Sequence, residues 1–151
     1  MYQNYNIGQT ALTLNLDFTV PKNHIVNTIS HFVDSIPQEV LLEETATTGR
    51  PAYHPAMMLK ILLFAYSRRV FSGRKIARML RENLPMMVLA WGRTLSYHTI
   101  NNFRSSAHAN HLVKKCFVYF TKLLADKGLI KAGAIFIDGT KIAADANRYT
   151  R

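Results

Sequence analysis

The chain has 151 residues, and 48% of them are hydrophobic, so it holds enough apolar material for a packed core and is not wholly disordered. This length fits one domain, or one domain with a piece of a second. The formal net charge of +10 favours an anionic partner, with nucleic acid ahead of a membrane surface. The single cysteine, Cys116, excludes an internal disulfide, and the longest apolar run, residues 61–66, is too short to cross a bilayer. Because no signal peptide opens the sequence, a reduced, cytosolic protein is expected.

The charge is concentrated in the middle of the chain. Residues 1–49 hold one Lys and five acids, a net charge of −4. Residues 50–122 hold thirteen Lys or Arg and one acid, a net charge of +12. Residues 123–151 hold five bases and three acids, a net charge of +2. The anion-binding surface is therefore expected in the middle third.

The first predicted elements run from an arm to a central helix. Residues 1–21 alternate between apolar and polar types and look extended, and Pro21 interrupts them. Residues 24–36 are predicted to be a helix with Ile25, Ile29, Phe32 and Val33 on its buried face. Residues 45–49 form a polar loop. Residues 56–68 are predicted to form a helix that is apolar almost all round, which places it at the centre of the core.

Two helices with polar outer faces follow. In residues 72–83, Ser72 is the expected N-cap, and Arg74, Arg78 and Arg81 fall together opposite the apolar side. Residues 84–91 form a short apolar segment that Gly92 ends. Residues 97–107 are predicted to be a helix capped by Ser96. The residues expected to face inward on it are Ile100, Phe103 and Ala107; those expected to face outward are His98, Asn101, Asn102 and Ser105, with Arg104 at the edge.

The last third changes from helix to strand. Residues 110–127 are predicted to be a long helix that Gly128 ends, with a buried stripe of Leu112, Cys116, Phe117, Phe120, Leu123 and Leu124. Residues 134–137 are a short apolar strand, and residues 141–144 are its hairpin partner across an Asp-Gly turn. Two strands alone are marginal in water, so this hairpin looks like the opening of a larger sheet.

The helices of residues 72–107 resemble the parts of a helix-turn-helix, with a short helix inserted in the long connection. Arginine can contact phosphate or guanine, and asparagine can bind an adenine edge through two hydrogen bonds. The residues predicted to bind DNA are Arg68, Arg69, Arg74, Lys75, Arg78, Arg81, His98, Asn101, Asn102 and Arg104. The alternative is an ordinary helical bundle with a solvated basic face. A zinc site is disfavoured, because His108 and His111 have no third ligand nearby in the sequence.

Asp138 follows the predicted strand directly and precedes a glycine. A carboxylate there projects from the end of a strand, where a metal ion can reach it. Taken alone, however, the position is more typical of a hairpin turn residue, because Asp-Gly is a common turn pair.

Several motifs together resemble a large group of bacterial insertion-sequence transposases of the DDE class. The stretches that carry the resemblance are residues 50–60 (RPAYHPAMMLK), 66–68 (YSR), 72–76 (SGRKI), 81–83 (REN), 91–92 (WG), 98–104 (HTINNFR) and 137–142 (IDGTKI). Each is weak by itself, but their order and spacing agree with the family over residues 50–150. Residues 12–45 look like the family's front segment, less specifically.

The resemblance implies a helical DNA-binding domain followed by an RNase H-like catalytic domain. In that family three carboxylates hold two divalent metal ions, usually Mg²⁺, and Asp138 matches the first of them. The second and third carboxylates are expected downstream of residue 151, so the chain is expected to be catalytically incomplete and to bind no metal by itself. Residues 143–145 (AAD) depart from the family, which often has Glu-Ala-Asn there, and Asp145 is too close to serve as the second carboxylate.

The resulting fold class is mainly α: a helix-turn-helix-like DNA-binding domain, then the first β-hairpin of a truncated RNase H-like α/β domain. The domain limits are residues 1–49 for the arm and first helix, 50–130 for the DNA-binding domain and 131–151 for the start of the catalytic domain. The expected partners are double-stranded DNA at terminal inverted repeats and either a second copy or a partner transposase chain, with no membrane. The expected location is the bacterial cytoplasm, at the nucleoid. The alternatives are a free-standing DNA-binding regulator and half of a split transposase completed in trans.

Overall fold

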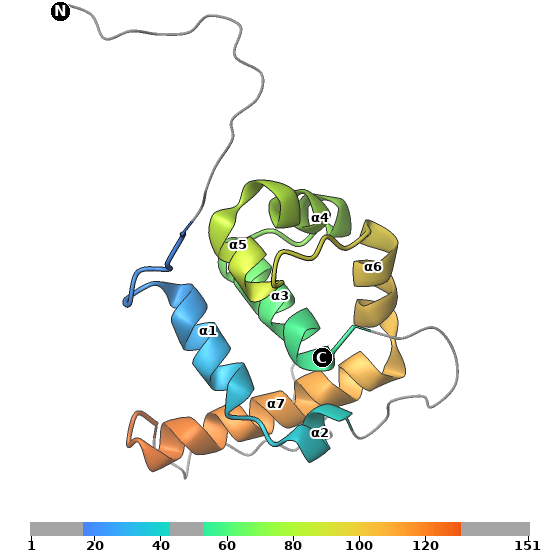
Figure 1. Cartoon of the computed structure of the whole chain (residues 1–151). Coiled ribbons are helices and arrows are strands. Elements are labelled where there is room, and N and C mark those ends of the chain that lie inside the picture. The colour runs from blue at the N-terminus through green and yellow to red at the C-terminus, as the bar shows by residue number, and fades with distance from the viewer. Residues whose placement is uncertain (1–16, 43–52, 131–151) are drawn as a thin grey trace, which may run out of the picture.

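The computed structural model describes residues 17–42 and 53–130, and every regular element within these ranges is a helix (Figure 1). The predicted arm before residue 17 and the predicted hairpin, with Asp138, lie outside the described residues. The helices are α1 (Ile25–Asp34), α2 (Gln38–Leu42), α3 (Pro55–Ser67), α4 (Gly73–Glu82), α5 (Leu84–Leu89), α6 (Tyr97–Ser105) and α7 (Ala107–Asp126). None of these helices is long and apolar enough to cross a membrane.

Polar side chains begin most of these helices where the sequence predicts a start. Ser96 Oγ accepts a hydrogen bond from the backbone N–H of Thr99 at 3.2 Å and so caps α6. Ser72 occupies the N-cap position of α4, although its side chain makes no capping hydrogen bond. The short helix predicted between the two basic helices is α5, which Asn83 caps through the N–H of Met86.

The core is divided into two hydrophobic clusters that share α3. The first cluster joins α1, α3, α4, α5 and α6, and Phe64, Ile76 and Ile100 are fully buried in it. The second cluster joins α1, α2, α3 and α7, with Leu59 and Leu112 among its members. Because α3 contributes to both clusters, its apolar residues lie on nearly all sides, as the sequence predicts. In Figure 1, α7 crosses one end of the bundle and α4–α6 lie toward the other.

The boundary between α6 and α7 corrects the sequence prediction. Ala107 was expected on the buried face of the shorter helix, but it is exposed and is the first residue of α7. The break comes at Ser106, whose backbone is extended (φ −72°, ψ 148°) and whose Oγ accepts from the N–H of Ala109 at 3.1 Å. Ser106 therefore ends α6 and, as its N-cap, also starts α7.

Three other predicted burial positions differ in the structure. Phe117 and Phe120 were placed on the buried stripe of the last helix, but their side chains are 52% and 41% exposed. On α1, Ile25 is 41% exposed, and Val26 takes the buried position instead. Neither helix is rotated as a whole, because Val33 on α1 and Leu112 and Cys116 on α7 are buried as predicted.

Candidate nucleic-acid interface

Helix α4 has one buried side and one strongly basic side. Ile76 and Leu80 are almost completely buried against α5, α6 and α3, and this orientation leaves the basic residues in solvent. The side chains of Arg78 and Glu82 are 74% and 67% exposed, and the closest approach of their charged atoms is 4.0 Å. An exposed pair of this kind contributes little, so it does not neutralise the helix. The exposed basic residues of α4 are Arg74, Lys75, Arg78 and Arg81.

Tyr97, the first residue of α6, connects this basic side to α6. The guanidinium of Arg74 lies over the Tyr97 ring, 5.0 Å from its centroid. The rings of Tyr97 and His98 lie in contact, with their centroids 3.9 Å apart and their planes inclined by 33°. An arginine over a tyrosine face is attracted by the ring's negative π surface, which holds the charge of Arg74 at the junction of the two helices. The exposed Arg74 and His98 and the half-buried Tyr97 between them therefore make a continuous edge from α4 to α6.

The crossing of α4 over α6 depends on Gly73 and two polar residues of α6. A Cβ atom at position 73 would lie 3.0 Å from Asn101 Cγ and closer still to Asn101 Oδ1, so any other residue here would force the Asn101 side chain to move. Arg104 Nη2 donates to Asn101 Oδ1 at 2.9 Å, and Arg104 Nη1 donates to the carbonyl oxygen of Phe71. The bond from Arg104 to Phe71 joins α6 to the segment just before α4, and the bond from Arg104 to Asn101, which lies within α6, holds the Asn101 side chain against Gly73.

The structure corrects the positions predicted for Asn101 and Arg104. Asn101 was predicted to point outward, but it is half-buried between α4 and α6. Arg104, expected at the edge of the buried stripe, is also half-buried and is engaged by the protein itself. Both residues hold the two helices in place, whereas the outward face of α6 consists of His98, Asn102 and Ser105, which are exposed.

The two arginines after α3 contact a different part of the molecule. Arg68 caps the C-terminus of α3, its guanidinium lies 5.4 Å from the Phe64 ring centroid, and its Nη2 is 3.3 Å from His24 Nε2. Arg69 has a left-handed backbone (φ 58°) that turns the chain away from the helix. Both side chains are exposed, but Arg68 contacts the residue that caps α1 rather than the edge between α4 and α6.

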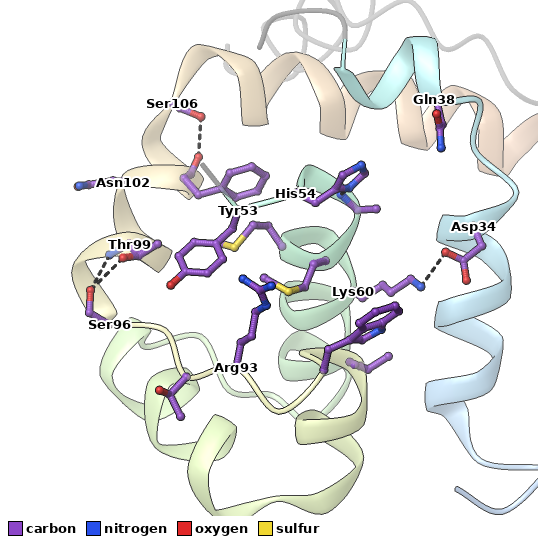
Figure 2. A pocket seen from close by; sticks show the side chains of 17 residues that line it. Asp34, Gln38, Tyr53, His54, Lys60, Arg93, Ser96, Thr99, Asn102 and Ser106 are labelled. Carbon is purple, nitrogen blue, oxygen red and sulfur yellow. Dashed lines mark hydrogen bonds and ion pairs between the residues drawn. The ribbon is translucent and has the colours of Figure 1, made fainter. Parts of the chain in front are cut away.

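A groove of about 1480 Å³ lies beside α6, between it, the start of α3 and the loop after α5 (Figure 2). Its lining includes Tyr53, Trp91, Arg93, Thr99 and Asn102. Figure 2 shows Arg93 directed toward Tyr53, with Asn102 at the edge of the groove.

Tyr97, Trp91 and Arg93 are not among the residues predicted from the sequence to bind DNA. Trp91 belongs to one of the motifs that resemble the transposase family. One usable signal was a large aromatic residue beside a glycine just after a predicted helix, where packing does not require an indole.

The predicted metal site does not fall within the part of the chain that the structure describes. Asp138, the predicted metal ligand, lies outside the described residues. Across residues 17–42 and 53–130, no three His, Cys, Asp or Glu side chains gather closely enough to hold a metal ion.

Comparison with known proteins gives one match. The model of a protein family described as "Transposase domain (DUF772)" matches residues 14–106, a range that includes α1 to α6 and the whole edge formed by Arg74, Tyr97 and His98. Searches of curated proteins and of solved structures found no match. The match ends before α7 and before Asp138.

Proposed function

The chain belongs to the transposase domain (DUF772) family, and from this premise we propose that it is the part of an insertion-sequence transposase that binds the terminal inverted repeats. The observation that carries the proposal is the exposed basic side of α4, joined through Arg74 and Tyr97 to the polar outward face of α6. In this arrangement α6 is the helix that enters the major groove, and α4 contacts the flanking phosphates.

The side chains of α4 suit contacts with phosphates, and those on the outward face of α6 suit contacts with bases. Arg74, Lys75, Arg78 and Arg81 carry charges that phosphates attract without regard to base sequence. Asn102 and His98 stand exposed on α6, and an asparagine amide can pair with the N6 and N7 atoms of adenine. Asn101 and Arg104 act indirectly, because they fix the angle at which α6 is presented.

Salt dependence of duplex binding tests this proposal. Replacing Arg74, Arg78 and Arg81 together with Ala is expected to weaken binding to any duplex and to lower the slope of log K against log salt by about three units, roughly one per lost phosphate contact. The measurement is fluorescence anisotropy with a labelled random-sequence duplex over a series of salt concentrations.

The matched control removes the same charge elsewhere. Lys114, Lys122 and Lys127 are exposed on or just after α7 and belong to no part of the α4–α6 surface. Replacing these three with Ala is expected to leave the slope almost unchanged, because a distant charge contributes only through the screened overall field. Equal effects of the two triple variants would show that binding is diffuse and would refute the assignment of α4.

The catalytic part of the proposal is separate and rests on the resemblance around Asp138. Asp138 would be one of three carboxylates that hold Mg²⁺ in a complete transposase, where the metal ions supply charge stabilisation for phosphoryl transfer. Asp138→Asn is expected to leave the duplex affinity of the 151-residue chain unchanged and to abolish strand cleavage by a complete transposase. A loss of duplex affinity in this variant, measured by anisotropy, would place Asp138 in the DNA-binding surface instead.

A further inference from the structure

Trp91 lies in the turn that ends α5, and its side chain is almost completely exposed to solvent. Its side chain is 87% exposed, and its backbone is left-handed (φ 54°), as is that of Gly92 (φ 67°). Backbone hydrogen bonds from Trp91 N to Val88 O (3.2 Å) and from Gly92 N to Met87 O (2.9 Å) close the turn. A bulky residue rarely adopts the left-handed region of positive φ, which glycine and asparagine tolerate far better. The left-handed backbone at Trp91 is therefore strained, and burial of the indole does not offset this strain because the side chain is exposed.

The groove beside Trp91 provides both aromatic and polar groups. Tyr53 adds a second ring, and Thr99 and Asn102 bring hydrogen-bonding groups from α6 (Figure 2). Lys60 Nζ lies 2.7 Å from Asp34 Oδ1, so these two charges in the lining compensate each other. Arg93 takes part in no ion pair with any residue of the described ranges, which leaves the groove with a net positive charge.

We propose that this groove binds an unpaired nucleotide of the DNA that α4 and α6 hold, with its base stacked on Trp91 and its phosphate near Arg93. An indole face with a cation close by is the usual arrangement for holding single-stranded nucleic acid. A base inside a duplex has both faces covered by its neighbours, so only a base outside the stack can lie on Trp91. Asn102 belongs both to the outward face of α6 and to the edge of the groove, so the two surfaces are continuous. The inference rests on the proposed DNA-binding function and extends it.

Because Trp91 is the only tryptophan in the chain, its fluorescence reports on this groove alone. The 151-residue protein is titrated with an oligothymidine of about 16 nucleotides and with a duplex whose ends are closed by non-nucleotide linkers, so that it holds no unpaired base. Stacking is expected to quench the fluorescence with the oligothymidine and with a duplex that carries unpaired thymines at its centre. The fully paired duplex is expected to bind without this quenching.

Substitutions give a second measurement that does not depend on tryptophan emission. Trp91→Ala is expected to weaken oligothymidine binding about 5- to 150-fold in anisotropy, the loss typical of one base–aromatic stack. Its affinity for the fully paired duplex is expected to stay the same. Trp91→Phe should retain part of the single-strand affinity, since it keeps a ring. Phe117→Ala is the matched control, because it removes an exposed ring (52%) on α7 that does not line the groove.

The outcomes separate the two proposals. If paired duplex does not bind at all, the proposed function itself fails. If duplex binding is normal but the oligothymidine neither quenches Trp91 nor loses affinity in Trp91→Ala, the groove inference alone is overturned. Equal quenching by paired and unpaired DNA would overturn it as well, since the indole would then contact duplex rather than a free base.

Discussion

Asn101 and Asn102 are adjacent on α6 and chemically identical, yet the structure gives them different roles. Asn101 Oδ1 accepts from Arg104 and packs on Gly73, whereas Asn102 is exposed at the outward face. Helical geometry accounts for the difference, because neighbouring residues point about 100° apart around the axis. A side chain that turns toward α4 becomes part of the packing, and one that turns away from it stays available to DNA.

This difference yields a paired prediction. Asn102→Ala is expected to relax base discrimination at one position by about 1–3 kcal/mol, because a two-bond contact to a base edge is lost. Asn101→Ala is expected to keep the same preferred sequence and to lower the thermal unfolding midpoint instead. Selection of binding sites from a randomised duplex pool, with thermal unfolding of each variant, measures both effects. The assignment is wrong if Asn101→Ala changes the selected bases and Asn102→Ala does not.

At the scale of elements, α4 and α6 approach closely because Gly73 has no side chain that would meet Asn101. Gly73→Ala brings a Cβ into Asn101 and is expected to destabilise the fold by about 1–3 kcal/mol, the range for overpacking a close contact. It is also expected to weaken duplex binding, because α6 must move relative to α4. Chemical denaturation and anisotropy measure the two effects.

A second substitution distinguishes steric overlap from a general intolerance of alanine. The atoms that a Cβ at position 73 would meet are Oδ1, Cγ and Nδ2 of Asn101, and Asn101→Ala removes all three. In the Asn101→Ala background, Gly73→Ala is therefore expected to cost nothing further, since alanine is otherwise the better helix residue. If the two changes add their full costs, the close contact is not the reason for glycine at this position.

The limits of α6 show what sequence patterns can and cannot predict about an element. Helices α3, α4 and α5 were predicted to within about two residues, because apolar spacing, prolines and capping residues all mark them. The break between α6 and α7 was predicted at residues 108–109 and lies at Ser106, since Ala107 fits the apolar stripe of the preceding helix and an alanine is compatible with either helix. Asn101 was misplaced for a related reason: its polarity suggested solvent, and nothing local indicates that glycine from α4 lies against it.

At the scale of the whole molecule, α7 is attached mainly through the second hydrophobic cluster, whose buried residues do not come from α4 or α6, although Phe103 of α6 packs against both clusters. Leu112 and Cys116 pack with Val33, Ile36 and Leu59 in the second hydrophobic cluster. Ile76, Leu80 and Ile100, which support α4 and α6, belong to the first. Damage to the second cluster is therefore expected to loosen α7 before it affects duplex binding.

Cys116 supplies a native reporter for this prediction. Burial raises the pKa of the Cys116 thiol, so at neutral pH it is protonated and reacts slowly with thiol reagents. The folded protein holds this proton more tightly than the unfolded chain. The resulting stabilisation is present below the ordinary thiol pKa and is lost as the pH rises through the raised value.

Leu112→Ala is expected to cost about 2–5 kcal/mol and to speed labelling of Cys116, because the cavity loosens the packing around the thiol. Duplex affinity is expected to remain at the level of the unmodified chain. Val113→Ala is the control, since Val113 is 55% exposed and next in the sequence. Two results would contradict the division into two clusters. One is an unchanged rate of Cys116 labelling in Leu112→Ala. The other is a loss of duplex affinity in Leu112→Ala as large as that in the variant with Arg74, Arg78 and Arg81 replaced by Ala.

The groove could not have been predicted from the sequence. Its lining comes from Asp34, Tyr53, Arg93 and Asn102, which are far apart along the chain, and no spacing rule links them. The basic side of α4, by contrast, is local: Arg74, Arg78 and Arg81 recur at helical spacing within one element. Local periodicity therefore predicted the exposed basic side of α4, whereas the neighbouring groove depends on how α1, α3 and α6 pack.

The order of the two clusters along the chain has a consequence for synthesis on the ribosome. Every buried residue of the first cluster lies between Val26 and Ile100, so this cluster is complete in sequence before α7 has been made. Proteins elongate at about 5–20 residues per second and helical units with local contacts fold far faster than that. The nascent chain can therefore assemble its α4–α6 surface while its carboxyl-terminal third is still being translated.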